Sequence, residues 1–227
     1  MTKKAELVGS YFGTIYLTVI SLLQGIVLSQ LVPNLIAYSK LAENPWTDYR
    51  LLPFILMLLI IFVVWHHYAI GIFFLRWFPN IIDTIIPFVV SIVQFFLLSY
   101  LSIQNSVSDI DMYAWTKGFA LILISGCLAY FGASWRLEAA LFTNIMSLQN
   151  AEMHLALSKK VYNFGGISVL VQGLFAVLIV VLHKEEWLLI SLILLVLHIV
   201  ISEYLLLKTV KPHFVRAMDE FDAHLKL

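Results

Sequence analysis

Residues 51–75 read LLPFILMLLIIFVVWHHYAIGIFFL and contain no Asp, Glu, Lys or Arg. A helix needs about 20 mostly apolar residues to cross a bilayer, so this stretch is long enough to span one. Similar stretches recur along the chain of 227 residues, of which 61% are hydrophobic and 12% charged. The mean hydropathy is +0.92. Too few charged groups are present to cover a soluble surface, which excludes a cytosolic enzyme, a nucleic-acid reader and a disordered chain.

Six segments of the sequence are candidate membrane spans. They cover residues 10–31, 51–75, 84–103, 116–135, 167–183 and 187–207. The predicted fold class is therefore all-α, a polytopic integral membrane protein with six transmembrane helices in a single domain. Lys184-Glu185-Glu186 directly follows the fifth span, so the fifth and sixth spans should form an antiparallel hairpin.

The distribution of Lys and Arg predicts the orientation of these spans. With a cytoplasmic N-terminus, the cytoplasmic segments carry ten basic residues and the outer segments four (Lys40, Arg50, Lys117 and Lys184). Basic residues accumulate on the cytoplasmic side of membrane proteins. We therefore expect both termini to be cytoplasmic and the protein to reside in the cytoplasmic (plasma) membrane.

Two of the outer connections carry turn signals. The connection 32–50 contains Asn44-Pro45, a dipeptide that favours a turn, followed by Trp46, which should lie at the membrane face. In the segment 105–111, Ser106 and Asp109 have the spacing of a capping box, which predicts a turn that leads into a helix.

The longest segment outside the predicted spans covers residues 136–163 and contains no Pro or Gly. We expect it to be a cytoplasmic helix that Gly165-Gly166 ends before the fifth span. One stripe of this helix carries residues spaced by seven: Leu141, Leu148, Leu155 and Tyr162. The tail 208–227 is predicted to be a second amphipathic segment. Both segments offer surfaces for packing within the protein, for oligomer contacts or for docking a soluble partner.

Few polar side chains fall inside the predicted spans, and an ionisable residue there is a functional candidate because it is costly to bury in lipid. At 1.5 Å per residue, His66 lies about 22 Å and Glu203 about 24 Å below the outer ends of their spans, and His198 about 16 Å below. Adjacent residues on a helix point about 100° apart, so His66 and His67 cannot both face Glu203. The predicted polar cluster in the inner half of the membrane comprises His66, His67, His198, Glu203, Gln94 and Gln172.

Three interpretations of this cluster remain open. It can be a structural hydrogen-bond network between helices, which is the commonest role of such residues. It can be a path for ions or protons in which Glu203 and a histidine titrate. It can hold haem or a metal through His198 with His66 or His67, although no cofactor is predicted because the spacing matches no metal motif.

The function that we expect is that of an oligomeric channel-like or transporter-like protein that passes a small ion or protons. One alternative is a membrane anchor or scaffold that docks a soluble partner through its cytoplasmic helix, and another is a small haem-binding or metal-binding membrane protein. An enzyme is less favoured, because the sequence contains no nucleophile elbow, His-Glu-x-x-His motif or phosphate loop. The expected partners are the lipid bilayer and further copies of the chain, and no nucleic acid.

Overall fold

The computed structural model of the protein describes residues 3–75, 81–138, 143 and 146–225, and these residues contain helices and no strands. The helices are α1 (Lys3–Leu41), α2 (Leu52–Leu75), α3 (Ile81–Ser99), α4 (Met112–Arg136), α5 (Leu148–Leu182), α6 (Leu188–Leu205) and α7 (Lys211–Leu225). Short 3-10 turns, η1 (Tyr49–Leu51), η2 (Val107–Asp109) and η4 (Glu185–Trp187), precede α2, α4 and α6. A π turn, η5 (Leu206–Val210), joins α6 to α7. The all-helical fold class is therefore confirmed.

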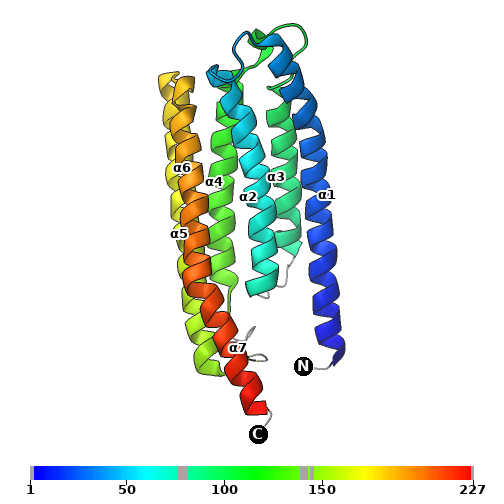
Figure 1. The fold of residues 1–227 in the computed structure, drawn as a ribbon, viewed down its shortest axis with the longest axis vertical. Coiled ribbons are helices and arrows are strands. Elements are labelled where there is room, and N and C mark those ends of the chain that lie inside the picture. Colours follow the sequence, from blue (N-terminus) through cyan, green and yellow to red (C-terminus); the bar gives the residue numbers. More distant parts are fainter. Residues whose placement is uncertain (1–2, 76–80, 139–142, 144–145, 226–227) are drawn as a thin grey trace.

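The helices α1 to α6 form a closed bundle. Among the described residues, each of them packs on two main neighbours, in the order α1, α2, α6, α5, α4, α3 and back to α1. The connections α1–α2, α3–α4 and α5–α6 lie at one end, which we name the connecting end (Figure 1). Helix α1 begins and α7 ends at the opposite end, the terminal end (Figure 1). A functional site built by several of these helices would lie in the interior of the bundle.

In the described part of the chain, five helical segments are long and apolar enough to cross a membrane. They are Thr14–Leu41, Tyr49–Gly71, Met112–Arg136, Leu148–Leu182 and Glu185–Ala217. The apolar segment in α3, Ile85–Ser99, is shorter than these five. The protein is therefore a membrane protein, whereas a sixth span and the cytoplasmic position of both termini stay predictions.

Helix α1 extends ten residues beyond the predicted end of the first span at Leu31 and includes Pro33. The buried Tyr38 anchors this extension, because its ring packs on Phe54 at 5.3 Å between centroids and its hydroxyl donates to the carbonyl of Pro45. The predicted turn at Asn44-Pro45 is confirmed, since the Asn44 carbonyl accepts from the amides of Thr47 and Asp48, each at 3.2 Å.

The connecting end also contains the predicted capping box, which is confirmed at Ser106 and Asp109. The amides of Asn105, Ser106 and Gln104 donate to the Asp109 carboxylate, and these three hydrogen bonds hold the pKa of that carboxyl below its usual value. The predicted α5–α6 hairpin is confirmed too. Helix α5 ends at Leu182, and the next residue, His183, has a left-handed φ of 52° that turns the chain into η4.

The prediction that Gly165-Gly166 breaks the helix is wrong, because α5 runs without interruption from Leu148 to Leu182. Both glycines face rings of α4. A Cβ atom on Gly165 would lie 2.5 Å from the Tyr130 ring, and one on Gly166 would lie 2.9 Å from the Phe131 ring. The close approach of α4 to α5 thus offsets the helix-weakening effect of glycine, which is about 1 kcal/mol per residue. The pair is a packing feature of α5.

Within the expected helix over residues 136–163, α5 begins at Leu148, and the described residues Leu137, Thr143 and Met146 before it are not helical. Ser147 caps α5 by accepting from the Asn150 amide, and this cap favours a new helix start at that point. Before the cap, Met146 is buried with Ala151 and Ala217, and Phe214 packs on them. Helix α7 therefore packs on the start of α5. The predicted tail is helical, and the side chains of Met218, Phe221 and Leu225 lie outside the described residues.

Candidate functional site

The contact between His66 and Glu203 joins α2 to α6. Nε2 of His66 contacts Oε1 of Glu203 as an ion pair or hydrogen bond, depending on protonation. Phe62, one turn earlier on α2, stacks on the His66 ring at 5.4 Å between centroids. Glu203 lies in the last turn of α6, directly before the π turn. Two ionisable groups that the sequence placed at similar depth are thus in direct contact.

His67 points elsewhere, as adjacent residues on a helix must. Its Nδ1 contacts the Val63 carbonyl at 2.8 Å. A carbonyl oxygen only accepts, so Nδ1 carries the proton and Nε2 of the neutral ring is an acceptor. The ring lies edge-on to Tyr130, at 5.2 Å and 81°, and stacks near His198, at 6.0 Å and 27°.

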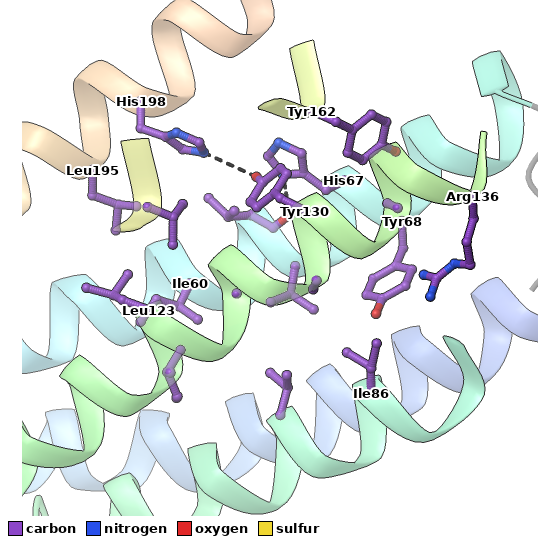
Figure 2. A pocket seen from close by; sticks show the side chains of 18 residues that line it. Ile60, His67, Tyr68, Ile86, Leu123, Tyr130, Arg136, Tyr162, Leu195 and His198 are labelled. Carbon is purple, nitrogen blue, oxygen red and sulfur yellow. Dashed lines mark hydrogen bonds between the residues drawn. The ribbon is translucent and has the colours of Figure 1, made fainter. Parts of the chain in front are cut away.

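Tyr130 and His198 complete this polar group from α4 and α6. The Tyr130 hydroxyl and Nε2 of His198 form a 3.2 Å hydrogen bond (Figure 2). Phe164 of α5 stacks on the His198 ring at 6.3 Å and 7°. His198 is 1% exposed, and its Nδ1 has no hydrogen-bond partner among the described residues. His67, Tyr130 and His198 therefore bring three helices together on one polar face.

Two cavities adjoin this polar face. The central cavity has a volume of about 140 Å³ and is lined by residues of α2, α3, α4, α5 and α6, including His67, Tyr130 and His198. The side cavity has a volume of about 20 Å³ and is lined by His67 and Tyr130 together with Ser158, Ser202 and Glu203, among other residues. His67 and Tyr130 thus form the wall between the two cavities.

The side cavity has room and partners for one water molecule. A buried water needs about 10–15 Å³ and two to four polar partners. The hydroxyls of Ser158 and Ser202 are buried and have no hydrogen-bond partner among the described residues. Glu203 lines the same cavity. These three groups can together hold one water close to the contact between His66 and Glu203.

The structure does not bring Gln94 or Gln172 into this group. Gln94 of α3 exchanges amide hydrogen bonds of 3.1 and 3.2 Å with Gln24 of α1, which lies on another side of the bundle. Gln172 donates to the Ser168 carbonyl of its own helix at 3.3 Å. Depth alone placed both near the histidines, but depth does not specify which face of a helix a residue occupies.

The predicted docking stripe is split between surface and interior. Leu148 is 61% exposed at the start of α5, and Leu155 is half-buried. Tyr162 instead lines both cavities. Leu141 lies outside the described residues. The docking of a soluble partner by this stripe stays a prediction.

The described residues hold no group of three or more His, Cys, Asp or Glu that could bind a metal ion. The prediction of no cofactor, and the alternative of haem or metal on His198 with His66 or His67, both stay untested.

Sequence reasoning missed four residues of the site, Tyr130, Arg136, Ser158 and Ser202, and it assigned Tyr162 to a docking surface instead. Tyrosine and serine are common in membrane helices, so composition does not single them out. One signal was available in α4. Gly126, Ala129 and Ala133 recur at helical spacing and lead to Arg136, so one face of α4 carries small residues and a charge at its end.

The comparisons with known proteins give no relative. No family model, no curated protein and no solved structure matches the chain. The function of this all-helical membrane protein is therefore inferred from its own residues and the contacts between them.

Proposed function

We propose that the protein is a transporter-like membrane protein that moves protons across the bilayer, with Glu203 and His66 as the groups that take up and release them. The contact between these two side chains, in segments long and apolar enough to span a membrane, is the observation that carries the proposal. Ionisable groups at such positions are rare and usually mark ion or proton paths.

The chemistry of the pair suits proton exchange. Histidine is the side chain whose charge ordinarily changes between pH 5 and 8, and a carboxylate in contact with it can accept or return the proton. When both groups are charged they attract each other, and when the proton moves from imidazolium to carboxylate both become neutral. The pair can therefore hold an extra proton without leaving an isolated charge.

A polar route continues from this pair toward the centre of the bundle. Glu203, Ser202 and Ser158 line the side cavity, and His67 and Tyr130 separate it from the central cavity. Hydroxyls and imidazoles both donate and accept hydrogen bonds. A water in the side cavity would link the carboxylate to the histidines of the central cavity.

The lining of the central cavity changes from polar to apolar along its length. Ile60, Leu123 and Leu195 lie at the end opposite Arg136 (Figure 2). These side chains cannot carry a proton, which supports a gated transporter rather than an open channel. Passage to the connecting end would then require a second arrangement of the helices.

Proton flux into liposomes tests this proposal. Glu203→Gln removes the carboxylate and keeps the side-chain size, so we expect flux to fall to the level of empty liposomes. Glu43→Gln is the matched control, because Glu43 is exposed in the connection between α1 and α2 and should leave flux unchanged. Size-exclusion profiles and thermal unfolding must match the wild type. Wild-type flux in Glu203→Gln, or no flux in the wild type, would reject the proposal.

A further inference from the structure

Buried polar side chains are hydrogen-bonded between α1 and α3 but incompletely bonded in α5 and α6. Gln24 and Gln94 bond each other, and Gln24 also donates to Ser91. In α5 and α6, by contrast, five residues that are at most 5% exposed each have a side-chain nitrogen or oxygen without a hydrogen-bond partner among the described residues. We name them the unbonded row: Ser158, Gln172, Ser191, His198 and Ser202.

The unbonded row follows one face of each helix. Ser191, His198 and Ser202 are spaced by seven and four residues on α6, and all three belong to its buried face. On α5, Ser158 and Gln172 are fourteen residues apart, which is close to four full turns.

A contact between the two helices shows which members of the row lie at one level. Phe175 of α5 stacks on Trp187 at 6.4 Å between ring centroids. In an antiparallel pair, a step back along one helix matches a step forward along the other. Gln172 lies three residues before Phe175 and Ser191 lies four residues after Trp187, so Gln172 and Ser191 are at nearly the same level.

The serines of the row differ from other serines in the helices of this protein. The hydroxyls of Ser21 and Ser125 donate to a carbonyl one turn earlier in their own helix, at 2.7 and 2.8 Å. This local bond satisfies a hydroxyl in an apolar medium. The buried hydroxyls of Ser158, Ser191 and Ser202 have no partner among the described residues. A buried polar group without a partner costs free energy, so this arrangement of α5 and α6 is less favourable than it would be with these groups bonded.

The row leads from the proton-binding pair to the connecting end. Ser202 directly precedes Glu203, and both line the side cavity together with Ser158. At the other end of the row, Ser191 lies three residues inside α6, near the connecting end (Figure 1). The distance along α6 from Ser202 to Ser191 is about 16 Å. This is the direction in which the apolar end of the central cavity offers no polar group.

The row is interrupted in this arrangement of the helices. The buried Leu195 lies on the same face of α6, between Ser191 and His198. Gln172 and Ser191 line neither of the two cavities. Water would reach them if α5 and α6 separated, and it would then bond the atoms that now have no partner. These new hydrogen bonds would offset part of the free energy that separation costs.

We propose that the unbonded row is the second half of the proton path, which water enters from the connecting end when α5 and α6 separate in the second arrangement of the helices. Each proton passes from water to water along hydrogen bonds, and the polar atoms of the row hold these waters in place. This inference deepens the proposed function and rests on it, since the row carries onward the protons that Glu203 releases.

The reactivity of an introduced cysteine tests whether water reaches the row. Ser191→Cys is made together with Cys127→Ala, reconstituted in liposomes and treated with a small membrane-impermeant methanethiosulfonate from the side of the connecting end. Thr116→Cys is the matched control, because Thr116 is equally buried and lies four residues inside α4 at the same end, but its hydroxyl donates to the Met112 carbonyl. We expect Ser191→Cys to react about tenfold faster or more, since local opening exposes it. Equal rates would overturn the inference.

Removal of one hydroxyl gives the second arm of the test. Ser191→Ala deletes a group that is unsatisfied in the closed arrangement, so the midpoint of thermal unfolding should rise by about 2–4 °C. The same gain opposes opening, and proton flux should fall about fivefold. Thr116→Val deletes a bonded hydroxyl and should not raise the midpoint or change flux. If Ser191→Cys does not fold, this alanine variant decides, and a lower midpoint or wild-type flux would overturn the inference.

The two proposals fail in different ways. A wild type without proton flux would reject the proposed function, and the role of the row in proton movement with it. An unreactive Ser191→Cys beside a wild type that moves protons would overturn the role of the row alone.

Discussion

Gly165 and Gly166 show how a single missing Cβ atom determines helix packing. The rings of Tyr130 and Phe131 occupy the space where these Cβ atoms would lie. The position of the Tyr130 ring matters further, because its hydroxyl bonds His198 and its side chain separates the two cavities. A substitution at Gly165 should therefore affect both stability and the polar group.

We expect Gly165→Ala to lower the free energy of unfolding. Overpacking costs about 1–3 kcal/mol, which exceeds the ~1 kcal/mol that alanine gains over glycine in a helix. Gly25→Ala is the matched control, because a Cβ atom there has no neighbour within 4 Å, so this variant should gain about 1 kcal/mol. Thermal unfolding in detergent measures both. A Gly165→Ala variant as stable as Gly25→Ala would show that the Tyr130 ring moves freely.

At the residue scale, the sequence predicts how deep a side chain lies in the membrane. It does not predict which face of its helix the side chain occupies. The fixed rise of a helix was enough to place His66 and Glu203 at one level, and the structure has them in contact. The same count placed Gln94 near His198, yet Gln94 bonds Gln24 of α1. Which face a residue occupies depends on how helices pack, and an almost uniformly apolar span such as α2 carries no pattern that reveals it.

At the scale of elements, the Gln24–Gln94 pair fixes α1 against α3. Both amides are buried, and each donates to the other's carbonyl oxygen. Ser91 accepts a further bond of 3.3 Å from Gln24. In an apolar medium such reciprocal hydrogen bonds orient two helices. Each bond contributes only about 0.6 kcal/mol on average to the free energy of unfolding.

A double-mutant cycle measures this pair. Gln94→Leu leaves the Gln24 amide with Ser91 alone, so we expect a loss of about 1 kcal/mol, and Gln24→Leu added to it should cost less than it does in the wild type. Gln172→Leu is the control, since Gln172 bonds within its own helix and should show no coupling with Gln24. Strictly additive effects of Gln24→Leu and Gln94→Leu would contradict an α1–α3 link. SDS-induced unfolding provides the free energies.

Element boundaries were predictable where local chemistry sets them. The turn at Asn44, the capping box at Ser106 and the hairpin after Leu182 all follow from residues within a few positions. Boundaries set by packing were not predictable. Helix α5 continues through Gly165-Gly166 because α4 lies against it.

At the scale of the whole molecule, the two ends of the bundle share one feature, an exposed tryptophan. Trp46 at the connecting end is 86% exposed, and Trp135, near the end of α4 at the terminal end, is 83% exposed (Figure 1). Tryptophan prefers the two membrane–water interfaces. The two side chains therefore indicate where the bilayer surfaces meet the bundle.

Labelling with a membrane-impermeant maleimide should establish how the bundle crosses the bilayer. Cys127 is buried and should give little background. We expect Glu43→Cys, Ser108→Cys and Lys184→Cys, all exposed at the connecting end, to be labelled from one side. Gln149→Cys, exposed at the start of α5, should be labelled from the other. If Glu43→Cys and Ser108→Cys are labelled from opposite sides, α2 and α3 do not both cross the membrane as the closed bundle requires.

The π turn at Leu206–Val210 has a consequence for how much the length of this chain can vary. A π turn holds one more residue per turn than the α-helical pattern while the helix continues on both sides. Removing a residue in α6, or in α7 before Phe214, would rotate everything after it by about 100° and separate Phe214 from Met146. Removing one within the turn would restore ordinary α-helical hydrogen bonding and keep both flanking helices in phase. This is therefore the place along the tail where a one-residue deletion should be tolerated.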